Sequence, residues 1–248
     1  MLISTDLDQT LLNNKSQVSE YTKDILDKAK AKGHIIAYNT ARHLAGVMDV
    51  YEQYVPDYLI LNGGCAIYDS KLNPIYEARV SLEDTKRLIK ILQDNKCGIL
   101  LEIGDGFLTD LEEVHQRFTN SRVADLAKID KGALKLVYYS DDHSLLKKLQ
   151  NEFSHLDMVN YLGTKLYKIS KYNKANGNKI LKEILGKEIK VASFGDDYGD
   201  IEMLQESDIA VCMKNSQEKL FSYDFNVTEF DNDNDGVGKW IEKNILMD

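Results

Sequence analysis

The chain has 248 residues, of which 43% are hydrophobic and 29% charged, a composition typical of a globular protein with one large or two modest domains. Its 31 Lys and Arg against 40 Asp and Glu give a formal net charge of −9, which argues against nucleic acid as a partner, because no basic surface is available to displace counterions. The N-terminus does not resemble a signal peptide, and no apolar run approaches membrane-spanning length. The cysteines are predicted to be reduced core thiols: Cys65, Cys97 and Cys212. We therefore expect a cytoplasmic protein without a membrane partner.

Strand and helix patterns alternate at both ends of the chain. The strands are predicted at residues 2–5, 34–39, 58–61, 190–195 and 209–213. The helices are predicted at residues 19–33, 42–54, 174–186, 200–207, 215–222 and 239–246. Alternation of this kind predicts a parallel sheet that helices cover on both faces.

The middle of the chain has a different organisation. Residues 81–95 are predicted to form a helix with Ser81 as its N-cap and acidic residues in its first turn. The sequence Gly104-Asp105-Gly106 between two apolar runs indicates a hairpin. We place an inserted α+β domain at residues 81–171, so that residues 1–80 and 172–248 together form the α/β core domain.

Asp6 and Asp8 follow the first predicted strand. Their two-residue spacing directs both side chains to the same side of an extended chain, and ligands bind at the carboxyl ends of the strands in open α/β sheets. One carboxylate there can attack phosphorus, and its neighbour can donate and accept the proton of the ester oxygen and of water. On spacing alone, solvated turn residues or a helix cap are equally good explanations.

A second acidic cluster follows the strand predicted at residues 190–195. It contains Asp196, Asp197 and Asp200, just before a helix. Carboxylates from two strand ends together with a substrate phosphate are a usual Mg²⁺ site. Capping of the helix N-terminus explains one of these acids but not a second cluster.

Two further segments carry groups suited to an anion. Thr40 and Arg42 follow the second strand, where a hydroxyl and a helix N-terminus can receive a phosphate oxygen, although Thr40 also suits a helix cap. Lys174 is placed at the positive end of a helix dipole, an unusual position for a cation unless an anion lies nearby.

These segments occur in the order of the four motifs of the haloacid dehalogenase superfamily: Asp6-Leu7-Asp8-Gln9-Thr10, Thr40, Lys174 and Gly195-Asp196-Asp197-Tyr198-Gly199-Asp200. More narrowly, the chain resembles the Cof-type (subclass IIB) phosphatases in the stretches LNGG, FGDDYGDIEML, IAVCMKNS and DNDGVGKWIEK. The resemblance covers nearly the whole core. It implies a Rossmann-like core domain, with the insertion at 81–171 as an α/β cap domain.

The resemblance also implies Mg²⁺-dependent hydrolysis of phosphate monoesters of small metabolites, with sugar phosphates favoured, through an aspartyl-phosphate. The implied nucleophile is Asp6 and the implied general acid/base is Asp8. The implied metal ligands are Asp6, the Asp8 carbonyl and Asp196, with Asp200 supporting the metal shell. Phosphate or substrate contacts are expected from Thr40, Arg42, Asn62, Gly63 and Lys174. The insertion supplies candidate specificity residues whose direction the sequence does not determine: Glu102, Phe107, Tyr138 and Tyr167.

Two residues depart from the family pattern. Gln9 stands where the family usually has Gly, and Gly199 stands where it usually has an Asn that can contact substrate. Two alternatives therefore stay open beside the phosphatase: a sugar phosphomutase, and a phospholigand-binding protein with little turnover. The oligomeric state does not follow from the sequence.

Residues 231–242 also match a calcium-loop template, with Asp231, Asp233, Asp235, Gly236 and Glu242 at its positions 1, 3, 5, 6 and 12. The preceding residues indicate strand and turn rather than the helix of an EF-hand, and Gly238 stands where the template prefers an apolar side chain. We therefore interpret this segment as a polar turn before the last helix, with a calcium-binding structural protein as the least favoured hypothesis.

Overall fold

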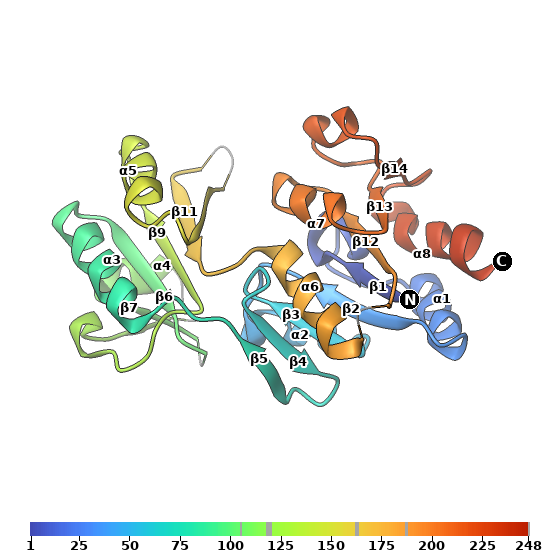
Figure 1. The fold of residues 1–248 in the computed structure, drawn as a ribbon, viewed down its shortest axis with the longest axis horizontal. Coiled ribbons are helices and arrows are strands. Elements are labelled where there is room, and N and C mark those ends of the chain that lie inside the picture. Colours follow the sequence, from blue (N-terminus) through green and yellow to red (C-terminus); the bar gives the residue numbers. More distant parts are fainter. Residues whose placement is uncertain (105, 118–120, 162–163, 187, 248) are drawn as a thin grey trace. The chain divides into compact units, whose positions relative to one another are not determined.

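The structure is a computed structural model that describes residues 1–104, 106–117, 121–161, 164–186 and 188–247. Two compact units make up the chain (Figure 1). Unit 1 comprises Met1–Arg42, Gly46–Tyr76 and Lys174–Asp248, and unit 2 comprises His43–Ala45 and Glu77–Asn173. Unit 2 thus extends a few residues beyond each end of the predicted insertion.

Unit 1 contains an eight-stranded sheet in the order β14-β13-β12-β1-β2-β3-β4-β5. The strands are β1 (Leu2–Thr5), β2 (Ile35–Asn39), β3 (Tyr58–Leu61), β4 (Ala66–Asp69), β5 (Pro74–Glu77), β12 (Val191–Gly195), β13 (Ile209–Cys212) and β14 (Asn226–Val227). Every pair from β14 to β3 is parallel, whereas β4 is antiparallel to β3. The predicted parallel sheet is confirmed, and β4 and β5 extend it beyond the predicted strands.

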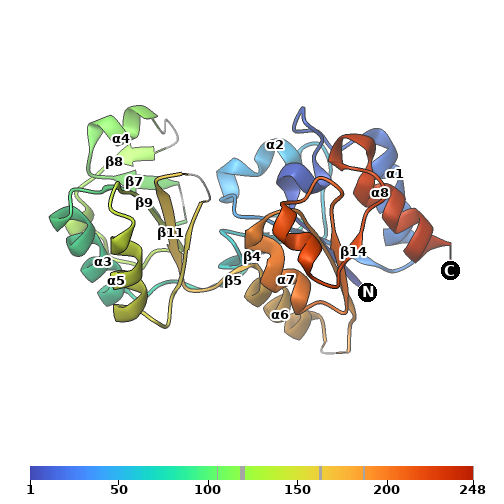
Figure 2. The same cartoon turned by 90° about the horizontal axis from the view of Figure 1, so that it is seen from above.

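Helices cover both faces of this sheet. They are α1 (Glu20–Ala31), α2 (Met48–Tyr51), α6 (Lys174–Leu185), α7 (Ile201–Gln205) and α8 (Gly236–Ile241). Helix α1 packs against α8 and α6 packs against α7, and Figure 2 shows the two pairs on opposite faces of the sheet. Because β1 and β12 are covered on both sides, all their residues are buried, as expected of central parallel strands.

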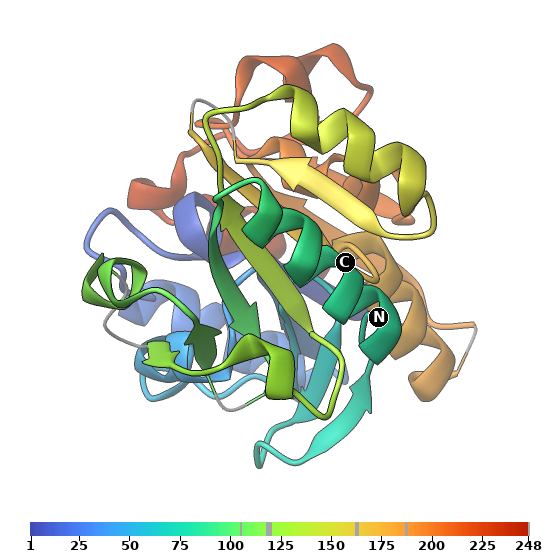
Figure 3. The ribbon, with the colours of Figure 1, turned by 90° about the vertical axis from the view of Figure 1, so that its left-hand side faces the viewer.

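Unit 2 contains a six-stranded, mostly antiparallel sheet in the order β10-β11-β9-β6-β7-β8. Its strands are β6 (Gly98–Glu102), β7 (Phe107–Thr109), β8 (Ser121–Val123), β9 (Lys135–Tyr139), β10 (Asp157–Asn160) and β11 (Leu166–Ser170), and its helices are α3 (Leu82–Asp94), α4 (Glu112–Arg117) and α5 (Ser144–Glu152). Helices α3 and α5 lie over the same face of the sheet (Figure 3) and bury a hydrophobic core against it.

The Ser81 cap is confirmed, because the Ser81 hydroxyl accepts a hydrogen bond from the backbone N–H of Asp84 at 3.0 Å. Strands β6 and β7 pair antiparallel, as the hairpin signal predicted, although Asp105 of the predicted turn lies outside the described residues.

Two predicted helices are wrong in length or type. The helix expected at residues 42–54 is reduced to a 3-10 turn and the four-residue α2, since Gly46 lies within its first turns. The helix expected at 215–222 is a 3-10 segment, Glu218–Ser222.

Among the residues that the structure describes, no helix combines the length and the apolar character that crossing a membrane requires.

Candidate active site

Three acidic residues lie together at the carboxyl ends of β1 and β12. Asp6 follows β1, and Asp196 and Asp200 follow β12. Because β1 and β12 are parallel neighbours, with Thr5 opposite Phe194, both strands end at the same edge of the sheet. Carboxylate oxygens of the three residues lie within 4.8 Å of one another, and all three side chains are buried. The structure therefore brings together acids that are about 190 residues apart in sequence.

Asp200 is fixed by the backbone of the segment that follows β12. Its Oδ2 accepts hydrogen bonds from the backbone N–H groups of Asp196 (3.0 Å) and Asp197 (3.1 Å). The close approach requires Gly195, since a Cβ at that position would lie only 2.5 Å from the Cβ of Asp200. Asp197 does cap the helical turn, because its side chain accepts from the N–H of Tyr198.

Lys174 supplies the positive charge of this cluster. It is the first residue of α6, and its Nζ lies 2.8 Å from Asp6 Oδ1 and 2.7 Å from Asp200 Oδ1. Burial alone would lower the pKa of Lys174, but the charges of Asp200 and Asp6 and the hydrogen bonds to both raise it above its ordinary value. The Lys174 ammonium is therefore charged and forms ion pairs with both Asp6 and Asp200.

One lysine does not balance three carboxylates. Burial, opposed by Lys174 and reinforced by the charge of Asp200, raises the pKa of Asp6 to about 7. Burial and the charge of Asp6 raise the pKa of Asp196 to about 8, against a hydrogen bond from Thr10. Carboxylate oxygens are the donors that hard divalent cations prefer, and such a cation would offset the burial and the repulsion that raise these pKa values. The donor set thus fits a divalent metal ion.

Thr10 was part of the first motif but had no predicted role. Its hydroxyl donates to Asp196 Oδ1 at 2.6 Å, within the buried cluster. The turn at Leu7–Leu11 that follows β1 turns Thr10 inward, and Gln9 within it has a φ of 60°. The Gln9 side chain is exposed and so does not enter the cluster, while its carbonyl accepts from Asn215 Nδ2 at 2.8 Å. The strain at Gln9 explains why Gly suits this position.

The Asp8 carboxylate is paired with Arg42. Arg42 Nε lies 2.9 Å from Asp8 Oδ2, and Nη2 lies 2.5 Å from Oδ1, a bidentate arrangement. A second acid, Asp49, accepts from Arg42 Nη1 at 3.2 Å. The Asp8 side chain is 58% exposed, in contrast to the three buried acids. The Arg42 guanidinium is therefore engaged by two carboxylates.

The predicted phosphate-contacting residues lie in two loops that hydrogen-bond to each other through the backbone. Gly63 N–H donates to the Thr40 carbonyl (2.9 Å), and Asn62 N–H donates to the Arg42 carbonyl (2.8 Å). Thr40 is buried, and its hydroxyl accepts from the N–H of Arg42 at 3.2 Å. Asn62 Oδ1 is buried without a hydrogen-bond partner in the described part of the chain.

Gly199 lies in the 3-10 turn between β12 and α7. A Cβ at this position would have no atom within 4 Å, so the site has space for a side chain. The backbone therefore accepts the family's Asn here, and this chain lacks only the side chain itself.

Three acids of the calcium-loop template contact α1 or the segment before it, whereas Asp231 accepts from Asn234 within its own turn. Asp233 Oδ1 accepts from the N–H of Asn14 at 3.1 Å. Asp235 Oδ1 accepts from the hydroxyls of Ser19 and Thr22, at either side of the start of α1. Glu242 accepts from the Tyr21 hydroxyl at 2.6 Å. These carboxylates connect the segment around α8 to α1.

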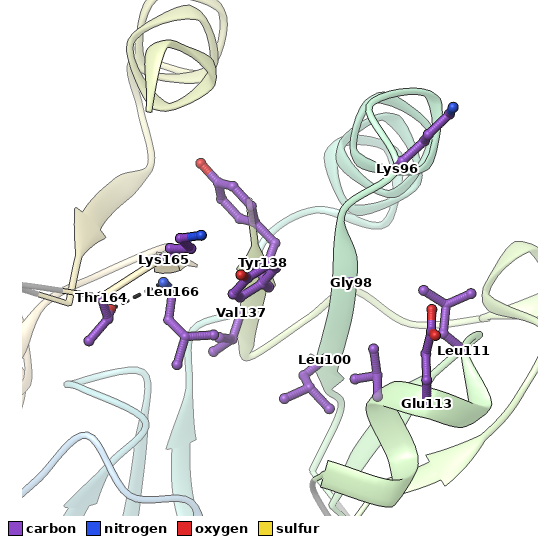
Figure 4. Close-up of a pocket in the computed structure, with 12 residues that line it drawn as sticks. Lys96, Gly98, Leu100, Leu111, Glu113, Val137, Tyr138, Thr164, Lys165 and Leu166 are labelled. Carbon is purple, nitrogen blue, oxygen red and sulfur yellow. Dashed lines mark hydrogen bonds between the residues drawn. The ribbon is translucent and has the colours of Figure 1, made fainter. Parts of the chain in front are cut away.

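Unit 2 contains a pocket of about 590 Å³ (Figure 4). Leu100, Val137 and Leu166 line it from β6, β9 and β11. None of the predicted catalytic, phosphate-binding or metal-binding residues lines it. Of the candidate specificity residues, Tyr138 and Tyr167 stack with ring centroids 4.8 Å apart and belong to the hydrophobic core beneath α3 and α5.

Comparison with known proteins agrees with this geometry. The sequence model of the haloacid dehalogenase-like hydrolases matches residues 3–241. The pyridoxal phosphate phosphatase YbhA of Escherichia coli (strain K12) is 23% identical, over 99% of this chain and 98% of that protein. The 5-amino-6-(5-phospho-D-ribitylamino)uracil phosphatase YitU of Bacillus subtilis (strain 168) is 24% identical, over 98% and 96%.

The fold of this chain also matches the folds of solved structures. BT1666 from Bacteroides thetaiotaomicron, a phosphatase of this superfamily, superposes with a TM-score of 0.84 at 22% identity, covering 98% of this chain and 94% of that one. The family match spans nearly the whole chain, the curated relatives have similar length, and the acidic cluster lies where the motifs predicted it. The protein therefore belongs to the haloacid dehalogenase-like hydrolases, as a phosphatase of the Cof type.

Proposed function

We propose that the protein hydrolyses phosphate monoesters of small metabolites, with sugar phosphates as the favoured class, through an aspartyl-phosphate on Asp6. The observation that carries this proposal is the Lys174 ammonium 2.8 Å from Asp6, beside Asp196 and Asp200 at the same strand ends. A buried carboxylate next to a fixed cation can attack an electron-rich phosphoryl group only if the charge around it is balanced. Lys174 supplies part of the positive charge that this balance requires.

The proposed cofactor is Mg²⁺, held by Asp6, Asp196 and the Asp8 carbonyl with Asp200 in support. Bound there, it would supply positive charge to the carboxylates and to the phosphoryl oxygens. Thr10 restricts the Asp196 carboxylate through its 2.6 Å hydrogen bond, and Asp200 is held by two backbone N–H groups. These hydrogen bonds support the proposed metal-binding roles of Asp196 and Asp200.

In the proposed first step, an Asp6 oxygen forms a bond to phosphorus while the bond from phosphorus to the ester oxygen breaks. Asp8 gives its proton to that oxygen, and the alcohol leaves. In the second step, Asp8 takes a proton from water, the water oxygen attacks phosphorus, and the bond to Asp6 breaks to release inorganic phosphate.

Further residues have proposed roles around the phosphoryl group. Lys174 neutralises charge near Asp6, and Thr40, Asn62 and Gly63 contact phosphate or substrate oxygens. Arg42 is proposed to contact substrate as well, which requires its guanidinium to leave the bidentate pair with Asp8 and thereby lets Asp8 carry the proton of the first step.

We propose that residues 81–171 act as a cap domain that supplies substrate specificity. The named relatives act on phosphorylated small molecules of several kinds, including pyridoxal phosphate and a phosphorylated ribityl compound. A sugar phosphatase of subclass IIB, BT4131, has the same fold, with a TM-score of 0.80 at 19% identity. The proposed location is cytoplasmic, where these buried cysteines would stay reduced: Cys65, Cys97 and Cys212.

The test is a panel of sugar phosphates, pyridoxal phosphate and other phosphorylated metabolites, incubated with the protein and Mg²⁺, with inorganic phosphate as the readout. We expect phosphate release that chelation of the metal abolishes. Conversion of a sugar phosphate to its isomer without phosphate release would instead identify a phosphomutase. A rise in melting temperature with phosphorylated ligands, but with no product, would identify a binding protein.

A further inference from the structure

A buried hydrogen-bond network lies between α6 and the sheet of unit 1, next to the acidic cluster. At its centre, Asn178 Oδ1 accepts from the Ser4 hydroxyl (2.7 Å) and from Asn39 Nδ2 (3.0 Å), and Asn178 Nδ2 donates to the Ser193 hydroxyl (2.9 Å). The four side chains come from α6, β1, β2 and β12, and all four residues are buried. No step of the proposed reaction uses any of them.

Asn39 connects this network directly to Lys174. Its Nδ2 also donates to the Lys174 carbonyl at 3.0 Å, so the amide group of one strand residue contacts two positions of α6. Because the Lys174 carbonyl and Asn178 Oδ1 are both acceptors, the amide nitrogen of Asn39 must face α6. Asn39 Oδ1 is left buried without a hydrogen-bond partner among the residues that the structure describes. Such an unsatisfied oxygen is unfavourable, and it results from directing the amide donors at the helix.

The network fixes the first turn of α6. Asn178 is four residues after Lys174, so the two lie on the same face of the helix, one turn apart. Ser4 is two residues before Asp6 in the same strand segment, and Ser193 is three residues before Asp196. The strands that end in the acids are thereby hydrogen-bonded to the helix that begins with the lysine.

We propose that Asn39 and Asn178 are positioning residues, which hold Lys174 so that its ammonium lies between Asp6 and Asp200. This inference rests on the proposed function of Lys174. A lysine side chain is long and flexible, so the place of its charge depends on how firmly its backbone is held. Directional hydrogen bonds to three strands add a defined position to the close packing between helix and sheet.

The first experiment compares Asn178→Leu with Ser207→Ala as a matched control. Leu has the same number and branching of side-chain heavy atoms as Asn, although it is bulkier, and it cannot hydrogen-bond to Ser4, Asn39 or Ser193. Ser207 lies at the far end of the same network, where its hydroxyl contacts Ser193 at 2.6 Å and the Met203 carbonyl. We expect kcat of Asn178→Leu to fall by about 10²-fold, since displacement of a catalytic group by about 1 Å has that effect. We expect Ser207→Ala to keep the wild-type kcat, whatever its melting temperature.

A kinetic cycle with Lys174→Ala then distinguishes positioning from general destabilisation. If Asn178 acts through Lys174, Asn178→Leu lowers kcat in the wild-type background and has no further effect in the Lys174→Ala background. Wild-type kcat in Asn178→Leu, or losses that multiply in the double variant, would overturn the inference. If Asn178→Leu does not fold, Asn39→Ala takes its place in the cycle, because it removes the hydrogen bond to the Lys174 carbonyl.

Binding of inorganic phosphate with Mg²⁺, measured by calorimetry, separates failure of this inference from failure of the proposed function. A wild-type protein that binds phosphate but releases none from any substrate contradicts the proposed function alone. Weaker phosphate binding by Asn178→Leu and by Lys174→Ala, with Ser207→Ala unchanged, supports the positioning role. Equal phosphate binding by Asn178→Leu and wild type contradicts it.

Discussion

Lys174 Nζ lies 2.8 Å from Asp6 Oδ1, and each of the two side chains is only 10% exposed. The same ammonium contacts Asp200, which is fully buried, while Asp196 has Thr10 rather than a cation as its hydrogen-bond partner. The cluster therefore holds more carboxylates than positive charges. Its proposed chemistry, its metal affinity and its effect on stability all follow from this imbalance.

Asp6→Asn is expected to abolish Mg²⁺-dependent phosphate release from a generic aryl phosphate. The amide of Asn cannot act as the nucleophile. Lys174 also contacts Asp200, but that carboxylate follows β12 and is held by backbone N–H groups, so it does not replace Asp6. Asp94→Asn, at an exposed ion pair with Lys90 in unit 2, serves as the control and should have wild-type turnover. Retention of more than a few per cent of activity by Asp6→Asn would exclude Asp6 as the nucleophile.

Asp8→Asn is expected to have an effect that depends on the leaving group. Alkyl phosphates release a poor leaving group that needs a proton, so their hydrolysis should slow by about 10²- to 10⁴-fold, the usual contribution of general acid catalysis. With p-nitrophenyl phosphate the first step needs no proton, and the loss should be smaller. Rates of phosphate release for both substrates measure this difference. Equal losses would contradict the acid role of Asp8.

Lys174→Met is expected to lower the free energy of unfolding by about 3–5 kcal/mol, because removal of one partner leaves buried carboxylates without their counter-charge. The loss should be greater at pH 8 than at pH 5, since protonation of the acids relieves the repulsion at the lower pH. Urea denaturation in the presence of EDTA measures it. Lys182→Met, at a half-exposed pair with Asp208, is the control and should cost about 0–1 kcal/mol. Similar losses for both variants would contradict the charge imbalance.

The metal-free protein is expected to lose stability as pH rises from about 4 to about 8. The pKa values of Asp6 and Asp196 rise from the ordinary 3.8 to about 7 and about 8 on folding. Across that window the folded state binds more protons than the unfolded state, so the free energy of unfolding falls as pH increases. If the proposed Mg²⁺ binds the ionised carboxylates, its addition should weaken or reverse the fall.

Asp196→Asn isolates this contribution from other titrating groups. With EDTA present, the variant's unfolding free energy should depend less steeply on pH than that of the wild type. In a separate measurement without EDTA, added Mg²⁺ should no longer raise the variant's melting temperature. Indistinguishable pH profiles for the two proteins would show that Asp196 ionises normally in the folded state.

Asp235→Ala is expected to destabilise the protein by about 1–3 kcal/mol without changing its response to calcium. The substitution leaves the hydroxyls of Ser19 and Thr22 without their acceptor. It also places Ala at a φ of 62°. Asp235→Asn keeps an acceptor and tolerates that φ, so it should be nearly neutral. Thermal melts with and without CaCl₂ test this, and a calcium-induced shift that only Asp235→Ala loses would favour a metal site.

Local sequence was sufficient to predict most elements of unit 1 and the existence of an α+β insertion. Short runs rich in apolar and β-branched residues predicted β1, β2, β3 and β12, and Ser81 marked the start of α3. The helix prediction at 42–54 was wrong because it relied on apolar periodicity and neglected the low helix propensity of Gly46. Strands β4 and β5 were missed: β4 follows β3 after a short turn, and the edge strand β5 has no fully buried residue to mark it as a strand.

By itself, the sequence determined that the chain carries the four motifs of its family in order, and hence which acids and which lysine were candidates. Only the tertiary structure decided that Asp200 and Thr10 belong to the buried cluster, that Asp8 pairs with Arg42, and that Asn178 hydrogen-bonds to three strands. The physical reason is that motifs record local backbone and residue type. Burial, charge balance and hydrogen-bond partners arise from strand pairing between residues that are distant in the chain.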